Sequence, residues 1–564
     1  MKPNRPTFRQ WRQMILQRLT LKEKFYFYSL VFILFASLLS WGIVSYYSKT
    51  QAVPKNGGEY IEGIVGQPRY LNPMISAYNN TDKDLSRIIY SNLFEYNADG
   101  KLQNDLAESY EISEDKTTYT VHIRQDVFWH DGEKLTAEDV LFTAKLISDP
   151  NYKIPIRSNW SGIETNLIDD YTISFKTTSP FVGFLNTLTF GIMPKHLWES
   201  IGPEKFALTD LNLNPIGSGP YKFNSFQKDS NGNIISYKLI ANPQYYKQKP
   251  YISKVTFIFH TEEDIIDAYN SKEIMGMNSI SAQKVSEIKK IQSTNLHKID
   301  VPWYFSVFFN QNKSVPLAYN EVRKALAHAT NRQEIVDNVF NGNAQQSFTP
   351  FLPSMPGYTD DINKFDFNID TANKIFEDND WKKGDDGIRV KNDTRVEFNL
   401  VVIDQPDLIR IAEIIKNQWE AVGARININA FSVFDIQQNH IRPREYDALL
   451  FGQGLGGHLD PYPFWHSSMR KDPGLNLSIF ESSDIDKLIE DGRIEFDEEK
   501  RVSIYQEFQK KLAEEVPAVF LYNPSYLYPV NKSIRGNEIQ FMTNPSERFS
   551  NIENWYLKTK RIWK

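Results

Sequence analysis

One long stretch near the start of the chain is apolar at almost every position. From Phe25 to Tyr46 the sequence reads FYFYSLVFILFASLLSWGIVSY and contains no charged residue. Because about 20 apolar residues in a helix cross the hydrocarbon core of a bilayer, the stretch predicts a membrane-spanning helix. We assign residues 25–47 to a transmembrane anchor and residues 48–58 to a short polar tether.

The charges around this stretch predict its orientation. The preceding residues carry one acid, Glu23, and many cations, namely Lys2, Arg5, Arg9, Arg12, Arg18, Lys22 and Lys24. By the positive-inside rule, residues 1–24 form a basic cytoplasmic segment, and the bulk of the chain lies outside the cell membrane, in the extracellular or periplasmic space.

A cleaved signal peptide is the alternative to a retained anchor. Its apolar region would usually span only ~7–15 residues and end in small residues. Here Tyr46 and Tyr47 stand at the exit, and the nearest small-x-small triplet is Thr50-Gln51-Ala52. We therefore prefer an uncleaved, single-pass anchor.

Beyond the anchor, short periodic patterns alternate between strand and helix. Tyr119, Val121 and Ile123 alternate with polar residues as in a half-buried strand, and Thr136 opens a helix with a capping-box pattern. Alternating strands at 396–402 and 426–430 flank an amphipathic helix that begins at Pro406. A strand, a helix and a strand in this order form a βαβ unit with parallel strands. The exported part is therefore predicted to be α/β with sizeable mixed sheets.

Composition narrows the function classes. A net charge of -6 over 564 residues argues against a nucleic-acid surface, which needs a concentrated basic face. The chain has no cysteine, which excludes disulfides, thiolate metal sites, cysteine nucleophiles and a lipid anchor on an N-terminal cysteine. An aromatic share of 14% predicts a large core and some aromatic side chains in a ligand cleft.

An ordered series of short motifs carries a family resemblance. The series is Pro68-Arg69-Tyr70-Leu71-Asn72-Pro73, Leu93-Phe94-Glu95-Tyr96, Leu106-Ala107-Glu108-Ser109-Tyr110, Asp131-Gly132, Leu135-Thr136-Ala137-Glu138-Asp139-Val140, Gly217-Ser218-Gly219-Pro220-Tyr221, Ala241-Asn242-Pro243 and Val322-Arg323-Lys324-Ala325-Leu326. From about Glu59 to Gly536 the chain resembles the family-5 extracellular solute-binding proteins, the oligopeptide- and dipeptide-binding class of ABC importers. Most of these motifs are expected to be structural, and Arg323 is expected to brace its helix.

The resemblance implies a two-lobed periplasmic-binding-protein-like fold with an extra inserted domain. Lobe I would combine 59–90, 214–310 and 516–564, the inserted domain would span 91–213, and lobe II would span 311–515. The implied function is capture of an oligopeptide or related solute between the lobes, enclosure by hinge closure, and delivery to an ABC importer permease. No cofactor and no nucleic acid is implied, and we expect a monomer.

The expected ligand contacts lie in four segments. Tyr78, Asn79 and Asn80 follow the opening motif, where the chain of the family passes under its ligand. Trp303 and Tyr304 lie on the crossover that leads to Asn310, and Tyr522 lies on the returning C-terminal strand. The fourth segment follows the strand 446–451 and supplies Gln453, Gly454, Gly457, His458 and Asp460. Core packing is the alternative for every aromatic residue in this set.

The fourth segment departs from the family pattern. Family members similar to this chain usually have an acid three residues before the Asp-Pro pair, where it captures the amino group of a peptide, but Gly457 stands at that place before Asp460-Pro461. Because burying an unpaired ammonium is costly, we expect either ligands with a blocked or absent amine, or compensation by Asp460. The same segment spells G-x-G-x-x-G, but Pro461 and Pro463 prevent the helix that a dinucleotide site requires.

We predict no enzymatic activity and no metal site. Nine histidines are scattered without an H-E-x-x-H motif, and no G-x-S-x-G motif occurs. Two readings from other classes stay open: a tethered ligand sensor, and a secreted glycosidase with a pair of carboxylates.

Overall fold

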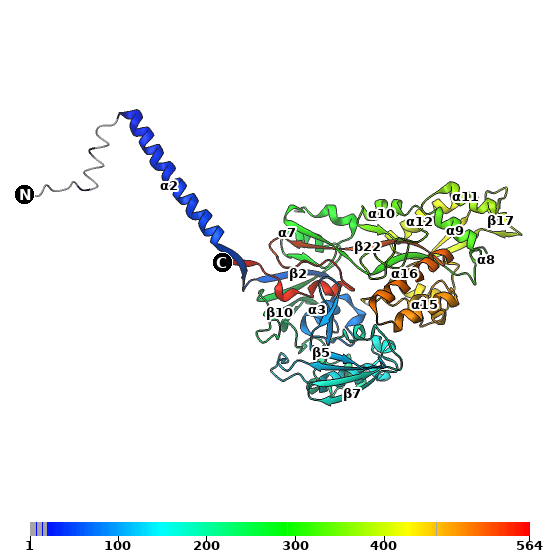
Figure 1. The fold of residues 1–564 in the computed structure, drawn as a ribbon, viewed down its shortest axis with the longest axis horizontal. Coiled ribbons are helices and arrows are strands. Elements are labelled where there is room, and N and C mark those ends of the chain that lie inside the picture. Colours follow the sequence, from blue (N-terminus) through cyan, green and yellow to red (C-terminus); the bar gives the residue numbers. More distant parts are fainter. Residues whose placement is uncertain (1–6, 8–13, 15–19, 290, 458) are drawn as a thin grey trace, which may run out of the picture. The chain divides into compact units, whose positions relative to one another are not determined.

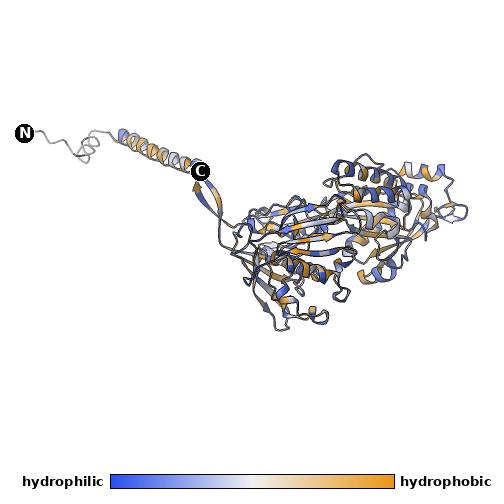
Figure 2. Ribbon diagram, turned by 60° about the horizontal axis from the view of Figure 1, so that its bottom comes forward, coloured by the Kyte–Doolittle hydropathy of each residue, from blue (hydrophilic) through white to orange (hydrophobic). Residues whose placement is uncertain are grey.

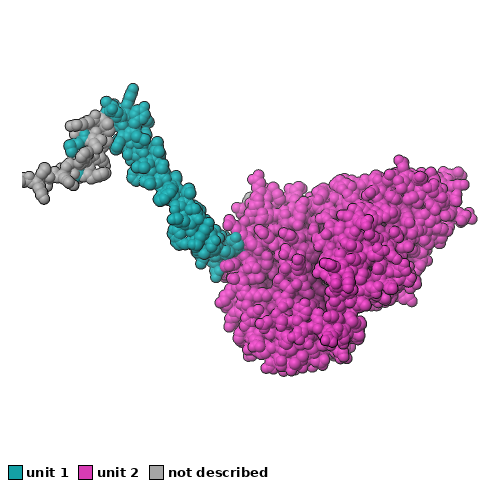
Figure 3. All heavy atoms as spheres, in the orientation of Figure 1, with its two compact units in different colours: residues 1–57, 556–564 teal, residues 58–555 magenta. Residues whose placement is uncertain are grey.

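The computed structural model describes Thr7, Met14 and residues 20–289, 291–457 and 459–564. The chain forms two compact units, residues 1–57 with 556–564 and residues 58–555 (Figure 3). Because the smaller unit contains both ends of the chain, the larger one is connected to it at two points in the sequence.

The smaller unit consists of one apolar helix and a two-stranded ribbon. Helix α2 (Leu21–Lys49) begins with a capping box between Thr20 and Glu23, has no buried residue, and has a mean hydropathy of 2.1 in its most apolar window. Figure 2 shows the helix as mainly hydrophobic along its length. Strand β1 (Thr50–Lys55) follows at once and pairs antiparallel with β23 (Lys558–Trp563). Residues 50–55 of the predicted short polar tether are thus paired with a strand from the end of the chain, a partner that local sequence does not reveal.

One long mixed sheet runs through the larger unit (Figure 1). The path of hydrogen-bonded neighbours is β20-β19-β21-β14-β22-β12-β2-β11-β10-β9, and β13 and β15 also pair with β22. Their bounds are β2 (Glu59–Val65), β9 (Tyr221–Lys228), β10 (Ile234–Ala241), β11 (Lys254–His260), β12 (Gly276–Met277), β13 (Thr294–Asp300), β14 (Trp303–Phe309), β15 (Ala344–Gln346), β19 (Glu397–Ile403), β20 (Arg425–Phe431), β21 (Ala448–Gly454) and β22 (Ala518–Asn531).

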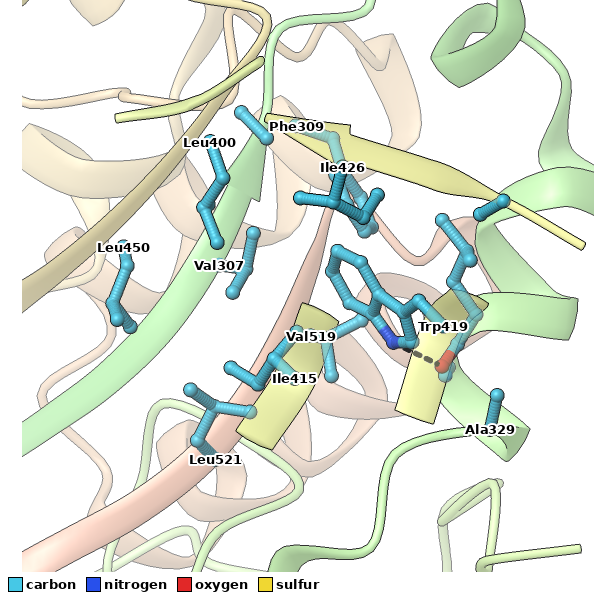
Figure 4. Packing of buried hydrophobic residues seen from close by; sticks show 14 of the residues in the cluster. Val307, Phe309, Ala329, Leu400, Ile415, Trp419, Ile426, Leu450, Val519 and Leu521 are labelled. Atoms are coloured by element: carbon cyan, nitrogen blue, oxygen red, sulfur yellow. Dashed lines mark hydrogen bonds between the residues drawn. The ribbon is translucent and has the colours of Figure 1, made fainter. Parts of the chain in front are cut away.

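Lobe II forms around the predicted βαβ unit. Strands β19 and β20 are parallel, and helix α12 (Pro406–Ala421) joins them, as the hydrophobic periodicity predicts. Trp419 of α12 is fully buried in the lobe II core (Figure 4), and its indole donates to the Leu326 carbonyl at 3.0 Å and to Thr330 Oγ1 at 2.9 Å. The other main helices of this lobe are α9 (Asn320–His328), α10 (Arg332–Phe340), α11 (Ile369–Asp378), α15 (Ser483–Ile494) and α16 (Glu498–Glu515).

The inserted segment has its own sheet and core. Strands β5 (Ala107–Ile112), β6 (Thr118–Ile123), β8 (Thr172–Lys176) and β7 (Glu164–Asp169) lie in this order in an antiparallel sheet, and β3 (Phe94–Tyr96) pairs with β4 (Leu102–Asn104). Helix α4 (Ala137–Ser148) begins with the predicted capping box, made here by Thr136 and Asp139. Buried aromatic residues of this core, including Trp129 and Trp160, explain part of the aromatic content.

Two long strands connect lobe I with lobe II. The first half of β22 pairs with β14, and its second half pairs with β13. Val307 of β14 and Leu521 of β22 are buried in the lobe II core, whereas Leu527 packs in lobe I. Side chains of β14 and of the first half of β22 thus pack in one core, and Leu527 in the second half of β22 packs in another.

Candidate ligand-binding site

Two neighbouring strands of lobe II bring four of the predicted residues together. In the register of β14 and β21, Trp303 lies opposite Gly454 and Tyr304 lies opposite Gln453. The Tyr304 hydroxyl donates to Gln453 Oε1 at 2.5 Å, and Gln453 Nε2 donates to the Leu475 carbonyl at 2.8 Å. Burial raises the pKa of Tyr304 well above its usual value. Tyr304 and Gln453 are therefore a buried, mutually satisfied pair that fixes the end of β21.

Trp303 lies at the surface end of the same strands and is half-buried. A Cβ atom on Gly454 would stand 2.8 Å from the Trp303 ring, closer than ordinary van der Waals contact. Glycine is thus needed for the indole to lie across the backbone of β21. Of the four residues, Trp303 and Gly454 offer a partly open surface next to the crossing between the lobes.

Tyr522 lies on the third strand of this group but packs in the core. Its ring is 2% exposed, stacks on Phe305 at 4.9 Å with an interplanar angle of 5°, and lies 4.5 Å from Phe340. The structure therefore places Tyr522 among the lobe II core residues, which is the core-packing alternative stated for it.

The three predicted residues near the start of α3 (Asn80–Ile89) have local roles. The Asn79 side chain accepts from Thr81 N at 3.0 Å as the helix cap and donates to the Gln67 carbonyl at 2.7 Å. Tyr78 is 67% exposed, and its hydroxyl donates to the Lys153 carbonyl at 3.1 Å. Asn80 is exposed. The hydrogen-bond partners of Tyr78 and Asn79 belong to lobe I and the inserted domain, not to β14 and β21.

The loop after β21 packs against the inserted domain at Gly457. A Cβ atom there would lie 2.0 Å from Cζ of Tyr96, whose hydroxyl donates to Asn186 Oδ1 at 2.7 Å. The ring of Tyr96 thus occupies the place into which an acidic side chain at position 457 would project. His458 lies outside the described residues. In the described chain, the next helix after β21 begins only at Tyr462, which agrees with rejecting a dinucleotide site.

Asp460 has a partner within the protein. Its Oδ2 atom lies 3.2 Å from Nε of Arg493, and its Oδ1 atom accepts from Tyr462 N at 3.0 Å. Burial nevertheless raises the pKa of Asp460, and Arg493 only partly offsets this effect. A ligand ammonium could reach the carboxylate only by competing with the guanidinium of Arg493.

Arg493 also connects lobe II with the inserted domain. Its guanidinium carbon lies 4.3 Å from the centre of the Tyr462 ring and 4.8 Å from that of Phe181, and its carbonyl accepts from Val182 N at 2.9 Å. A cation over an aromatic ring is attracted by the ring quadrupole. Arg493, Tyr462 and Phe181 therefore form a latch between the two parts, which we call the Arg493 latch.

A second contact joins lobe I to lobe II. Gln283 Nε2 donates to the Val339 carbonyl at 2.6 Å and to Asp407 Oδ1 at 2.9 Å. Lobe II is thus joined to lobe I at Gln283 and to the inserted domain at the Arg493 latch. The face of the larger unit in Figure 3 is hollowed near its middle.

Sequence reasoning missed Tyr96, Phe181 and Arg493. Tyr96 belongs to a motif for which a structural role is expected, and Arg493 is one of many cations on amphipathic helices. Tyr96 and Arg493 have no local sequence signal, because each acquires its role from a partner far away in the sequence. Within the described ranges, no three His, Asp or Glu side chains gather as a metal site requires.

The chain is similar to known proteins over most of its length. The family model described as "Bacterial extracellular solute-binding proteins, family 5 Middle" matches residues 101–475. Oligopeptide-binding protein AppA of Bacillus subtilis is 27% identical over 525 residues, covering 90% of this chain and 93% of that protein. The dipeptide-binding protein of Escherichia coli is 27% identical over 502 residues, covering 84% and 90%.

A solved structure extends the similarity to the fold. The structure of B. subtilis AppA in complex with a nonapeptide superposes with a TM-score of 0.71 at 26% identity, and covers 90% of this chain and 100% of its own. The expected α/β binding-protein fold is confirmed. The comparisons favour neither the sensor nor the glycosidase alternative.

Proposed function

Because the chain belongs to the bacterial extracellular solute-binding proteins of family 5, we propose that it captures an oligopeptide or a related solute between its lobes and delivers it to an ABC importer. The proteins similar to it are named for oligopeptide and dipeptide binding. The protein itself needs no catalytic group for this role, since capture and release depend on closing and opening the lobes. We propose that it acts as a monomer and is not an enzyme.

The observation that carries the proposal is the pair of contacts across the crossing strands. Lobe II meets the inserted domain at the Arg493 latch and meets lobe I at Gln283, while β22 pairs with β14 in one lobe and with β13 in the other. These contacts are made by individual polar and aromatic side chains rather than by the packing of one core on another. They are typical of hinge closure around a ligand.

The proposed ligand surface keeps the predicted residues that remain accessible. Trp303 and Gly454 supply an aromatic face and an open stretch of backbone, bordered toward the inserted domain by Gly457, which Tyr96 covers, and by Asp460, which Arg493 engages. Tyr304 and Gln453 support this surface from beneath through their buried hydrogen bond. A mostly apolar lining with few polar anchors suits a peptide side chain and backbone.

We also propose that α2 is retained as a single-pass anchor with the larger unit outside. The small-x-small triplet Thr50-Gln51-Ala52 lies inside β1, where Thr50 is 3% exposed and every residue is paired with β23. The apolar run is longer than the ~7–15 residues of a signal peptide, and Tyr46 and Tyr47 stand at its exit. The basic residues before α2 place its beginning in the cytoplasm.

Co-purification tests the proposal. The full chain, purified in detergent, should release peptides or related small solutes on denaturation, and mass spectrometry would identify them. Adding such a solute back at 100 times its Kd should stabilise the protein by about 2.7 kcal/mol, seen as a higher Tm. Trp303→Ala should lose the bound solute, whereas Phe434→Ala, at a 73% exposed position of lobe II, should retain it. Purified protein that neither carries a solute nor gains Tm with a tryptic peptide mixture would contradict the proposal.

A further inference from the structure

Residues of β23 donate hydrogen bonds to the C-terminal end of the apolar helix α2. Arg561 of β23 donates from Nε to Thr50 Oγ1 at 2.8 Å, and from Nη2 to the Thr50 carbonyl at 2.8 Å and the Tyr47 carbonyl at 3.0 Å. Lys564 N donates to the Lys49 carbonyl at 2.9 Å. The last carbonyl groups of a helix lack partners within the helix, and a cation is stabilised at this negative end of the dipole. Arg561 thus caps a helix end that lies 511 to 514 residues before it in the sequence.

Aromatic side chains gather at the same level. The Arg561 guanidinium lies 4.2 Å from the centre of the Tyr47 ring, and Trp563 packs edge-on against Tyr46 at 6.2 Å. Trp563 remains 68% exposed although it is large and apolar. Exposed Trp and Tyr rings next to a membrane span are typical of the headgroup layer, where an amphipathic ring is stable.

The ribbon is also basic without any compensating acid side chain. Between Lys24 and Glu59, and from Tyr556 to the end, the sequence has no Asp or Glu, while its cations are Lys49, Lys55, Lys558, Lys560, Arg561 and Lys564. At about 3.4 Å per residue, Lys55 and Lys558 lie roughly 17 Å along the strands from the exit. The Debye length at physiological salt is about 8 Å, so only cations near the helix end can reach the headgroups if the ribbon stands upright. These are Lys49, Lys560, Arg561 and Lys564.

From these observations we infer that the β1–β23 ribbon forms a membrane-proximal collar that binds anionic phospholipid headgroups in the leaflet where α2 leaves the bilayer. The inference rests on the proposed retention of α2 as an anchor. Trp563, Tyr46 and Tyr47 enter the interface, and Lys49, Lys560 and Lys564 contact lipid phosphates. Arg561 holds the collar on the helix. Both covalent connections to the larger unit leave from the far end of this ribbon, next to Lys55 and Lys558.

The absence of native cysteine allows a direct test. The full chain carrying Ile562→Cys, at a 40% exposed position, receives a single fluorophore and enters nanodiscs that contain lipids with a quencher on the headgroup. Ser48→Cys reports the helix exit, and Asn231→Cys, in the exposed turn between β9 and β10, is the control for the larger unit. One set of nanodiscs contains phosphatidylcholine alone, and the other contains phosphatidylcholine with about 30 per cent phosphatidylglycerol.

We expect quenching at positions 48 and 562 but not at 231, and stronger quenching at 562 with phosphatidylglycerol. Each lysine near an anionic surface should enrich anionic lipid about fivefold, an effect lost in 1 M salt, where the Debye length is about 3 Å. Lys49→Gln, Lys560→Gln and Lys564→Gln together should abolish the lipid dependence, whereas Lys222→Gln, Lys284→Gln and Lys500→Gln in the larger unit should not.

The opposite results separate the possible failures. A label at position 48 that is quenched, with a label at position 562 that is quenched in neither bilayer, would overturn the collar. This result would favour an importer subunit as the partner of the ribbon. Equal quenching at 562 in both bilayers would overturn recognition of anionic lipid. An unquenched label at 48 would show that α2 is not in the bilayer, which would contradict the anchor itself.

Discussion

The peptide amine is the ligand group on which the structure makes the sharpest prediction. In the family pattern an acid captures this ammonium, and losing one partner of a buried charge pair typically costs ~3–5 kcal/mol, or two to four orders of magnitude in affinity. Here Gly457 takes the place of the acid, and the Tyr96 ring fills the space beside it. We therefore expect N-acetylated and free-amine forms of one peptide to bind with Kd values within about tenfold of each other.

Compensation by Asp460 is opposed by its existing partner. For the 3.2 Å separation from Arg493, Coulomb's law with an effective dielectric constant near 20 gives a gross attraction of about 5 kcal/mol. A ligand ammonium that displaced Arg493 would first lose this attraction and would also open the latch to Phe181. The exchange of one cation for another leaves little net gain, so Asp460 should not confer a preference for the free amine.

Calorimetry on the full chain in nanodiscs at pH 7 would measure this preference. A peptide identified from the co-purified material is synthesised with a free and with an acetylated amine, and both forms are titrated into the wild type and into Asp460→Asn. Asp378→Asn, at an exposed position of α11, is the matched control. A free-amine preference above a hundredfold that vanishes in Asp460→Asn would show that Asp460 exchanges partners. The same preference unchanged in Asp460→Asn would refute our placement of the amine pocket.

Three further predictions follow from single positions. Gly457→Ala should push Tyr96 away and enlarge the radius of gyration of the ligand-saturated protein, measured by small-angle scattering. Gly202→Ala, where the added methyl group meets open space, should leave the radius unchanged. An unchanged radius for Gly457→Ala would show that the contact is not needed for closure. Arg548→Met should lower the free energy of unfolding by ~3–5 kcal/mol in urea titrations, because Arg548 is fully buried between the carboxylates of Glu62 and Asp84 and both would lose their cation. Arg410→Met, at an exposed position, should have little effect. An equal loss in both variants would argue against this explanation. Burial raises the pKa of Asp82 to about 6 from 3.8, so the folded state binds a proton at this carboxylate more tightly than the unfolded state. The free energy of unfolding should therefore fall by about 3 kcal/mol as pH rises from about 4 to about 6. Asp82→Asn should remove this part of the pH dependence of Tm.

Local sequence determined the elements whose signals are short in range. The uncharged run from Phe25 to Tyr46 predicted α2, and the alternation around Pro406 predicted the parallel pair β19 and β20, because one buried face imposes the period on both. The expected brace at Arg323 is also observed: its guanidinium donates to four carbonyl groups, those of Leu317, Ala318, Glu515 and Val516. Ordered motifs identified the family, since they record many such local requirements in sequence order.

Tertiary structure alone decided which distant segments meet. Residues 48–58 have the polar composition of a tether, and residues 50–55 among them form a strand because residues 558–563 pair with them. Tyr522 and Trp303 are both aromatic residues on strands, but one is buried in the lobe II core and the other is half-buried at the crossing between the lobes. The partners of Asp460 and Gly457, Arg493 and Tyr96, are not near them in sequence. Periodicity reports which face of an element is buried, whereas the identity of what covers that face depends on packing across the whole fold.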